Sequence, residues 1–253
     1  MLDIHTSFRG SIMTNLLFLS TSLHSANASS TQLGQQFIET WQREHGDATI
    51  RHRDLATDPV PHLTAARFAA FAVPPEQRTP EQAAEVELSD ALIQELQDSD
   101  VIVIALPMYN FGIPSTLKAY FDHIARAGIT FRYTAQGPEG LLTGKRAIVL
   151  ATRGGRYVGT PRDTQTRYVR DFLGFLGIDA VEFVYAEGLA MGGEHREQHY
   201  HLLAGAQRHQ WQVPGDEQQH EVHRVKTPRV EPVQPPGAVV HRVKAPEKLA
   251  LVF

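Results

Sequence analysis

The sequence predicts an α/β protein built on a parallel sheet, and three observations carry this prediction. Short apolar runs typical of strands alternate with longer segments in which apolar residues recur at helical spacing, from about residue 15 to residue 185. One run, residues 101–106, is apolar at every position, as expected of a central strand covered on both faces. With 253 residues, of which 42% are apolar, the chain can also build a full core.

The first half of the chain has well-marked element boundaries. In chain order we expect a strand at residues 15–20, a helix at 29–44, a strand at 49–54, a short helix at 65–71 and a helix at 80–97. The second of these elements is amphipathic, because Leu33, Phe37 and Trp41 fall on one helical face. The strand at 49–54 is more polar than the first, which favours a place near the sheet edge. Thr79 and Gln82 have the spacing of a capping box at a helix start.

The second half continues the alternation after one irregular stretch. Pro107 is expected to end the central strand, and Pro114 to open a helix that ends near Gly128. Residues 129–133 and the Gly/Pro-rich stretch after them are expected to be extended and irregular. The remaining elements are, in order, a strand at 146–152, a helix at 163–176, a strand at 181–185 and a last amphipathic helix from about residue 194. Parallel strands joined in this way require right-handed crossovers.

The two ends of the chain differ in composition from the middle. Residues 1–12 show no periodicity and are expected to be an unstructured extension, residues 13–212 form one domain, and residues 213–253 form a Pro-rich, disordered tail. The five residues VHRVK at 222–226 recur at 240–244, but two copies are too few for a solenoid. Residues 16–19 and Ala26-Asn27-Ala28 imitate a signal sequence, although the polar residues 20–22 favour a buried strand instead.

Composition excludes several classes of function. Lys and Arg total 24 against 28 Asp and Glu, so the formal charge of −4 argues against a protein that grips nucleic acid or anionic membrane. The absence of cysteine excludes disulfides, thiolate metal sites and cysteine nucleophiles. No apolar run approaches the roughly 18 residues that span a bilayer. We therefore expect a cytoplasmic protein with neither a nucleic-acid nor a membrane partner.

Three loops that follow strands have compositions suited to a ligand. Residues 20–30 carry many hydroxyls and lead into a helix, which suits a phosphate group, although Ser29 could simply cap that helix. Residues 107–114 combine thioether, aromatic and amide side chains, which suits a flat heteroaromatic ring or, alternatively, a packed turn. In residues 152–155, paired glycines permit close approach of a ligand or make a plain turn. Neither a GxGxxG nor a P-loop motif is present.

Several motifs in order along the chain resemble the FMN-dependent NADH-azoreductase/quinone oxidoreductase family. They are PMYNF at 107–111, KAYFD at 118–122, RAGITFRY at 126–133, GPEGL at 137–141, RGG at 153–155, FLGF at 172–175 and AEG at 186–188. The resemblance runs from about residue 13 to residue 207. It implies a flavodoxin-like, doubly wound parallel sheet of five strands in the order 2-1-3-4-5, and a homodimer with one FMN per subunit.

The resemblance also implies which residues contact FMN. Carried onto this chain, they are Ser22, Ala28, Ser29, Ser30, Met108, Tyr109, Asn110, Phe111, Thr152, Arg153, Gly154 and Gly155. Ala28 stands where the family often has serine, which removes one hydroxyl contact, whereas Thr152 replaces serine and keeps the hydroxyl. NADH would reduce the flavin, and a quinone or an azo compound would then reoxidise it in a ping-pong cycle. No catalytic side chain and no metal is expected, since the flavin carries the chemistry.

Two other classes of function remain open at this point. A flavodoxin-type electron carrier would use the same fold without a small-molecule substrate, although such carriers tend to be more acidic than this chain. A metal-binding or interaction protein would rest on His195, His199 and His201, but histidines without a carboxylate partner usually form a solvated face. Five aromatic residues exceed what one core region needs, and we expect some of them at a dimer interface or substrate pocket: Phe121, Phe131, Tyr133, Phe172 and Phe175.

Overall fold

The sheet has the predicted strand order. The computed structural model describes residues 15–46 and 48–191. Five parallel strands pair in the order β2-β1-β3-β6-β7, and their bounds are Asn15–Ser20 (β1), Thr49–Asp54 (β2), Val101–Pro107 (β3), Arg146–Thr152 (β6) and Ala180–Ala186 (β7). Because β4 and β5 form a separate hairpin, this order is the expected 2-1-3-4-5 with two numbers skipped. The polar strand β2 lies at an edge, as predicted.

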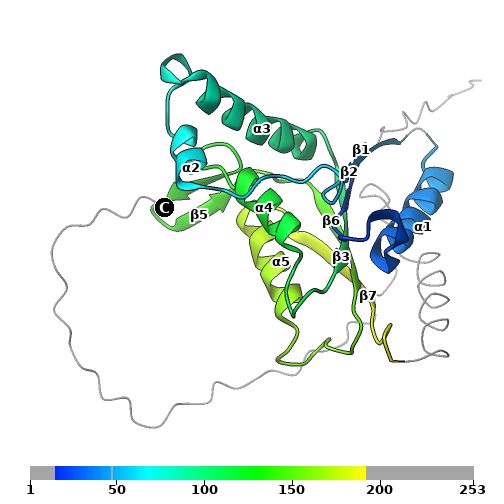
Figure 1. The fold of residues 1–253 in the computed structure, drawn as a ribbon. Coiled ribbons are helices and arrows are strands. Elements are labelled where there is room, and N and C mark those ends of the chain that lie inside the picture. Colours follow the sequence, from blue (N-terminus) through cyan, green and yellow to red (C-terminus); the bar gives the residue numbers. More distant parts are fainter. Residues whose placement is uncertain (1–14, 47, 192–253) are drawn as a thin grey trace, which may run out of the picture. The chain divides into compact units, whose positions relative to one another are not determined.

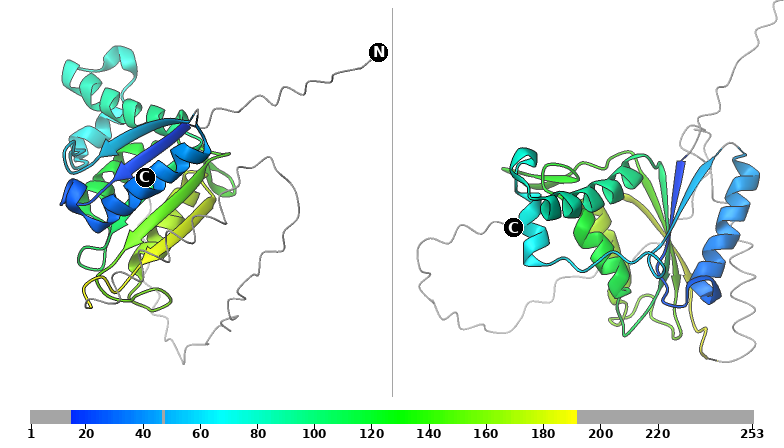
Figure 2. Two further views of the ribbon diagram at one scale, coloured as in Figure 1. Left: turned by 90° about the vertical axis from the view of Figure 1, so that its right-hand side faces the viewer. Right: turned by 45° about the horizontal axis from the view of Figure 1, so that its top comes forward.

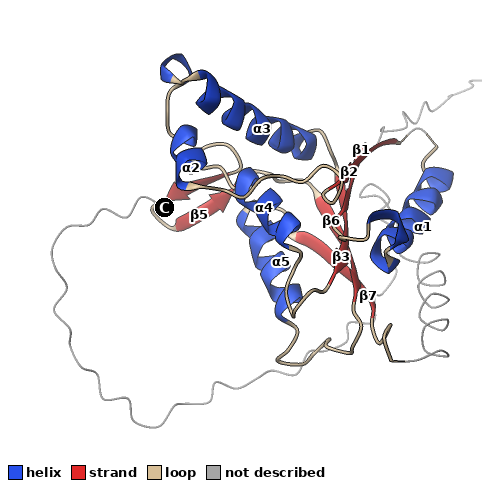
Figure 3. Ribbon diagram, in the orientation of Figure 1, coloured by secondary structure: helices blue, strands red, loops and turns tan. Residues whose placement is uncertain are grey.

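Helices cover both faces of this sheet (Figure 1). Helix α1 (Ser29–Glu44) lies on one face, and helices α3 (Pro80–Gln97), α4 (Ser115–Ile124) and α5 (Thr164–Phe175) lie on the other. The same separation is visible from a second direction in the right-hand view of Figure 2. The short helix α2 (Ala65–Phe71) belongs to the long connection between β2 and α3, and Figure 3 distinguishes these helices from the loops between them.

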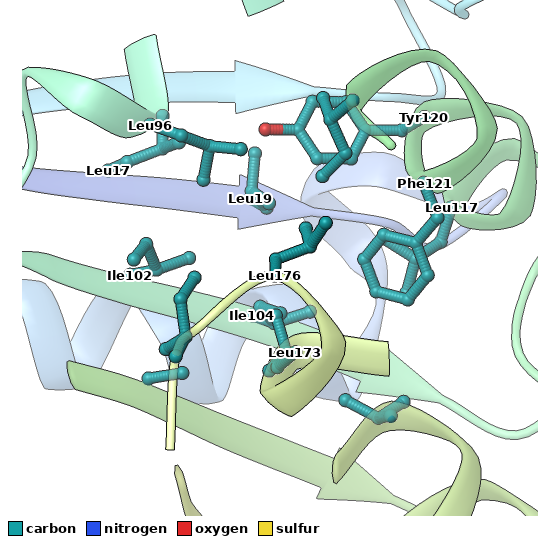
Figure 4. Packing of buried hydrophobic residues seen from close by; sticks show 14 of the residues in the cluster. Leu17, Leu19, Leu96, Ile102, Ile104, Leu117, Tyr120, Phe121, Leu173 and Leu176 are labelled. Carbon is teal, nitrogen blue, oxygen red and sulfur yellow. The ribbon is translucent and has the colours of Figure 1, made fainter. Parts of the chain in front are cut away.

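Alternating residues of the strands build two separate cores. Leu17, Leu19 and Ile104 face α3, α4 and α5, while Phe18 and Val103 face α1. Every residue of β3 is buried, as the unbroken apolar run predicted. Figure 4 shows α4 and α5 side chains packed over the first of these cores. Each fully buried Leu or Ile contributes about 1.5–3 kcal/mol, so these two cores supply the main favourable term in folding.

Local signals in the sequence explain several element boundaries. The Thr79 hydroxyl accepts a hydrogen bond from the backbone N–H of Gln82, and the Gln82 side chain accepts one from the backbone N–H of Thr79. The predicted capping box at the start of α3 is therefore confirmed. At α5, Asp163 is the N-cap and accepts from the N–H of Thr166. The predicted helix at 163–176 thus begins and ends one residue inside its expected bounds.

Two predictions for the stretch after β3 are wrong. The helix opened by Pro114 ends at Ile124 rather than near Gly128, because the Thr130 hydroxyl donates to the Ile124 carbonyl and accepts from the N–H of Arg126. The stretch expected to be irregular contains a regular antiparallel hairpin, β4 (Phe131–Thr134) paired with β5 (Gly137–Gly140). These short strands contain glycine and proline, which have low strand propensity, so propensity alone did not predict them.

The aromatic residues predicted to line an interface or a pocket mostly pack within the chain. Phe121 stacks on Phe172 with ring centroids 4.1 Å apart, and Phe131 contacts Phe175 at 4.3 Å. These four side chains belong to the core or pack against it. The expectation that some of the five aromatic residues lie at a dimer interface or a substrate pocket stays a prediction. Tyr133 is exposed. Pro107 also differs from expectation, since it forms the last residue of β3 instead of following the strand.

Some predictions concern residues outside the described part of the chain. They are the unstructured extension at 1–12, the disordered tail at 213–253, the helix expected from about residue 194, and the histidines His195, His199 and His201. The ends of the expected 13–212 domain also lie there. None of these predictions is tested by the structure.

Candidate functional site

The three loops singled out in the sequence meet at the carboxyl end of the parallel strands. Strands β1, β3 and β6 are direct neighbours, and their paired residues include Ser20 with Ala105 and Pro107 with Thr152. Since the strands are parallel, their carboxyl ends and the loops that follow them lie side by side. From β1 the chain continues to β2 on one side, and from β3 it continues to β6 on the other. The carboxyl end between β1 and β3 is therefore the topological switch point, where α/β sheets bind ligands.

The N-terminus of α1 has the features of an anion site. Its N-cap is Ala28, whose side chain makes no capping hydrogen bond, so the alternative in which Ser29 caps the helix is wrong. The hydroxyl oxygens of Ser30 and Thr31 are buried, and neither has a hydrogen-bond partner in the part of the chain that the structure describes. Free backbone N–H groups together with two unpartnered hydroxyls fit a phosphate group.

A hydrogen bond joins the first loop to the second. The hydroxyl of Ser22 lies 2.8 Å from the phenol oxygen of Tyr109. The backbone N–H of Leu23 donates to the same phenol at 3.3 Å. Both expected site residues are therefore brought together, and the Ser22 hydroxyl is oriented by a residue 87 positions further along the chain.

The second loop contains a tight turn in an unusual conformation. Tyr109 and Gly112 exchange two backbone hydrogen bonds, of 3.1 and 2.8 Å. Between them, Asn110 and Phe111 have φ angles of 49° and 65°. Asparagine tolerates this left-handed region, but phenylalanine adopts it rarely. The Phe111 side chain is 51% exposed, so a large apolar ring is presented to the outside by a strained backbone, as ligand-binding loops often do.

The third loop presents its backbone rather than its arginine side chain. Met108 donates its N–H to the Thr152 carbonyl at 3.1 Å, which joins the second and third loops. The Arg153 side chain is fully buried and forms ion pairs with Asp163 at 2.8 Å and with Glu187 at 3.1 Å. A ligand at this loop would therefore meet main-chain groups of residues 152–155. The guanidinium of Arg153 serves to hold the loop.

The paired glycines of the third loop have a packing reason within the chain. A Cβ added at Gly155 would lie 2.7 Å from the Tyr157 hydroxyl, and one added at Gly154 would lie 3.3 Å from the Ala190 Cβ. The close approach that these glycines permit is thus partly to neighbouring residues of the same chain. This approach brings residues 156–158 and 188–190 against the third loop.

Charged and titratable groups lie beside the first loop, at the end of β2. Burial alone would raise the pKa of Asp54, but hydrogen bonds from the Ser25 hydroxyl and the Ala56 N–H outweigh burial and lower it. Burial lowers the pKa of His52, whose Nε2 lies 2.9 Å from the Ser20 hydroxyl. The carboxylate of Asp54 therefore stays ionised and fixes Ser25, which has a φ of 45°.

A pocket of about 450 Å³ opens beside the turn of the second loop. Gly112 and Thr164 form part of its wall, and the other lining residues are His62, Ile113, Ser115, Lys118 and Tyr168. Gly112 and Ile113 belong to the second loop that the sequence singled out, and Lys118 begins the KAYFD motif. The sequence did not point to the other lining residues, which share no motif: His62, Ser115, Thr164 and Tyr168. Sequence reasoning also missed Gln165, which is buried and donates to two carbonyls of the second loop. Among the described residues, no helix is long and apolar enough to cross a membrane.

A doubly wound parallel sheet with an uncapped helix start and two further loops at its switch point is the architecture of flavodoxin-like proteins. Comparison with known proteins agrees, since the sequence profile of the flavodoxin-like fold matches residues 14–209. The chain therefore belongs to this family, and within it to the group of FMN-dependent NADH:quinone oxidoreductases, on the similarities that follow.

Proteins of that name from Cellvibrio japonicus and Burkholderia thailandensis are each 54% identical to this chain over 180 residues. The matches cover 71% of this chain and 90% and 91% of the two relatives, respectively. Among solved structures, an FMN-dependent NADH-azoreductase from Bacillus anthracis in complex with FMN superposes with a TM-score of 0.70 at 26% identity. That superposition covers 77% of this chain and 98% of the other.

Proposed function

We propose that this protein is an FMN-dependent NADH:quinone oxidoreductase that also cleaves aromatic azo compounds. The observation that carries the proposal is the meeting of three loops at the carboxyl end of the sheet. Beside them, at the start of α1, the hydroxyls of Ser30 and Thr31 have no partner among the described residues. The relatives at 54% identity bear the name of this activity, and the Bacillus anthracis structure supports the azoreductase reaction. Fold and site thus favour the same flavin chemistry.

Different groups of residues at the site suit the phosphate and the ring system of FMN. The backbone N–H groups of Ser29 and Ser30, with the Ser30 hydroxyl, would hold the phosphate. Ala28 would contribute its main chain only, through an N–H that also donates to the Ser25 carbonyl at 3.2 Å. Residues 108–111 would contact the isoalloxazine ring, and the main chain of residues 152–155 would approach its edge. The proposed contacts thus include the residues that the family resemblance named except Ser22, which holds Tyr109, and Arg153 acts through its backbone.

When bound, FMN would supply the two-electron chemistry between NADH and a quinone. The protein's own part is to bind and orient. The turn at Asn110 and Phe111 would lie against the ring, and Tyr109, held by Ser22, would fix the start of that turn. No side chain needs to act as a nucleophile. Because an azo bond needs four electrons for cleavage into two amines, it requires two such cycles.

The quaternary state and the location in the cell follow from the same proposal. We propose a homodimer, because the exposed ring of Phe111 leaves apolar surface at the site, and the exposed Tyr133 leaves more on the β4-β5 hairpin, that a second subunit would cover. Light scattering of the purified protein should give twice the monomer mass. A monomer with full turnover would contradict this part of the proposal. A cytoplasmic location is proposed because NADH, the expected donor, is an intracellular metabolite.

Two measurements test the function. Purified or FMN-reconstituted protein should show flavin absorption bands, and chromatography of the released cofactor should identify FMN. Anaerobic addition of NADH should then bleach these bands directly, and a quinone should restore them. An aromatic azo dye should consume two NADH per bond cleaved.

The outcomes separate the enzyme from its main alternative. A protein that binds FMN but is not reduced by NADH would instead be a flavodoxin-type electron carrier. Release of FAD, or no flavin after reconstitution, would refute the assignment of the cofactor.

A further inference from the structure

The first turn of α5 holds the second loop from outside. The amide nitrogen of Gln165, which is fully buried, donates to the carbonyl oxygens of Pro107 and Gly112, both at 2.9 Å. The hydroxyl of the preceding residue, Thr164, donates to the carbonyl of Phe111. Three carbonyls of one loop are thus bound by two consecutive side chains of one helix.

The second loop needs such an external hold. Its turn places two non-glycine residues, Asn110 and Phe111, at positive φ, where the backbone is intrinsically unfavourable. The two hydrogen bonds within the turn, between Tyr109 and Gly112, are all that the turn itself provides in the described structure. The carbonyl oxygen of the Gln165 side chain is buried without a partner among the described residues. An unsatisfied buried acceptor lowers stability, so Gln165 stabilises the loop only through its NH₂ group.

The same turn of α5 also holds the third loop. Asp163, the N-cap of the helix, receives the guanidinium of Arg153 at 2.8 Å, and the Thr166 hydroxyl lies 3.1 Å from the same nitrogen. Asp163 is fixed in turn by the N–H and hydroxyl of Thr166. Since the Arg153 side chain is fully buried and that of Asp163 is only 9% exposed, breaking the pair would leave a buried charge uncompensated.

A second carboxylate closes the arrangement. Glu187 accepts from Arg153 at 3.1 Å and from the backbone N–H groups of Tyr157 and Val158 at 2.8 and 3.0 Å. The ring of Tyr157 then meets the ring of Phe111 edge to face, with centroids 5.8 Å apart. The two loops are therefore connected both through α5 and through this aromatic contact.

We propose that the first turn of α5, residues 163–166, is a brace that sets the second loop against the third, and that Gln165 and Arg153 are positioning residues for the flavin. The role toward FMN rests on the proposed function, whereas the bracing of the loops does not. FMN would touch residues 108–111 and 152–155, and the brace would fix the distance between these two groups before the cofactor arrives. Preorganisation of this kind increases affinity because less freedom is lost on binding.

The first experiment removes the hold on the second loop in the full-length protein. Gln165→Met keeps the size of the side chain but loses both donated bonds, and Thr164→Val loses the bond to Phe111. The matched control is Arg170→Met, on the same helix, which loses one bond to the Val181 carbonyl far along the chain from both loops. Two quantities are measured, the amide hydrogen exchange of residues 108–112 without FMN and the dissociation constant for FMN.

We expect faster exchange in residues 108–112 and about tenfold weaker FMN binding for Gln165→Met, with a smaller effect in the same direction for Thr164→Val. Arg170→Met should change neither quantity. Unchanged exchange in Gln165→Met and Thr164→Val would overturn the brace. Faster exchange in a protein that binds no FMN would support the brace and refute the proposed function, so the two failures are distinguishable.

The second experiment tests whether one brace serves both loops. Arg153→Lys keeps the buried positive charge but cannot span Asp163 and Glu187 as the guanidinium does. If one brace serves both loops, either single change already loosens both of them. We therefore expect the double variant, Arg153→Lys with Gln165→Met, to lose less FMN affinity than the product of the two single losses. Strictly multiplicative effects would mean that the loops are held independently. Loss of FMN affinity in direct proportion to lost global stability, measured by urea unfolding, would reduce both residues to a general structural role.

Discussion

At the scale of single residues, the site depends on non-glycine residues that have a positive φ angle. Asn110 occupies the left-handed region, which asparagine tolerates better than other non-glycine residues, and Phe111 follows it at a larger positive φ. Ser25 has the same unusual sign of φ and is held by the carboxylate of Asp54 at 2.6 Å. Specific partners offset the unfavourable backbone conformation at two of these residues, since the Thr164 hydroxyl donates to the Phe111 carbonyl and Asp54 holds Ser25.

Asn110 is expected to matter through both its backbone and its amide. Asn110→Ala should weaken FMN binding and slow turnover, because it removes an amide worth about 1 kcal/mol net and places at positive φ a residue that tolerates this region less well than asparagine. Asn110→Gly separates the two causes, since it keeps the backbone conformation and removes only the amide. Titration of FMN into each variant measures the effect. If Asn110→Gly binds FMN as the unaltered protein does, the amide has no role in binding.

Asp54 should give a pH-dependent contribution to stability. Its pKa is lowered by the Ser25 and Ala56 donors in spite of burial, so its contribution is complete above the ordinary carboxyl pKa of about 3.9 and is lost as the pH falls through the lowered value. Asp54→Asn should cost about 1–2 kcal/mol in urea unfolding at neutral pH. The difference should shrink below about pH 4. The exposed Asp171→Asn serves as control and should stay within about 0.5 kcal/mol.

At the scale of elements, helix ends and a hairpin determine where the loops lie. Helix α1 begins without a side-chain cap, whereas α3 and α5 are capped by Thr79 and Asp163. Helix α4 also starts without a side-chain cap, at Pro114. Of these two uncapped starts, that of α1 is the one that faces the proposed phosphate position. A helix start left open at a switch point is thus consistent with a ligand in place of a cap.

Ser30→Ala should separate binding from stability. Because the Ser30 hydroxyl is buried and unpartnered in the described structure, its removal should leave the free energy of unfolding without FMN unchanged or slightly increased. FMN binding should weaken by about 1 kcal/mol, roughly fivefold, if that hydroxyl meets the phosphate. Thr40→Val is the matched control, since it removes an exposed hydroxyl from the same helix. A Ser30→Ala protein with lower stability and full affinity would contradict the assignment.

The hairpin of β4 and β5 is attached to the loop after α5 through two glycines. A Cβ at Gly140 would lie 2.0 Å from the backbone nitrogen of Gly177, and Gly177 itself has a φ of 95°. Since backbone atoms cannot yield as a flexible side chain does, Gly140→Ala should destabilise the protein by at least about 1–3 kcal/mol in chemical unfolding. Gly46→Ala has open space around its Cβ and should be nearly neutral. Equal stabilities of the two variants would show that the hairpin is not packed closely there.

At the scale of the whole molecule, the described fold and the similarities to other proteins cover the same part of the chain. The family profile matches residues 14–209, and the relatives match 71% of the chain. Both cores of the described structure consist of residues between Leu16 and Ala186. The proposed site and its brace also lie within these limits.

Removal of residues 212–253 should therefore leave the proposed activity nearly unchanged. This stretch contains many prolines and few large apolar residues, so it can bury little surface to offset an ordering entropy of about 1–2 kcal/mol per residue. A chain that ends at Trp211 should bind FMN and reduce a quinone with NADH at close to the full rate. Loss of FMN binding on truncation would place part of the site in the removed residues.

The sequence by itself determined the five strands of the main sheet and most helices, whereas the sheet order was what the family resemblance implied. Apolar runs such as residues 101–106 and a capping box such as Thr79 with Gln82 act locally, and local patterns are readable along the chain. The loops of the candidate site were also visible, because their composition departs from that of ordinary connections. The hairpin of β4 and β5 was missed, since its pairing depends on cross-strand partners and not on propensity.

Only the tertiary structure decided how those loops are held. The contact between Ser22 and Tyr109 joins residues far apart in the chain, and so do the bonds from Gln165 to Pro107 and from Arg153 to Asp163 and Glu187. The same is true of the inward direction of the Arg153 side chain, since the family resemblance had named this residue as an FMN contact without saying which of its groups takes part. Hydrogen bonds between distant segments leave no periodic signal in a single sequence, because they depend on where the folded sheet places each loop.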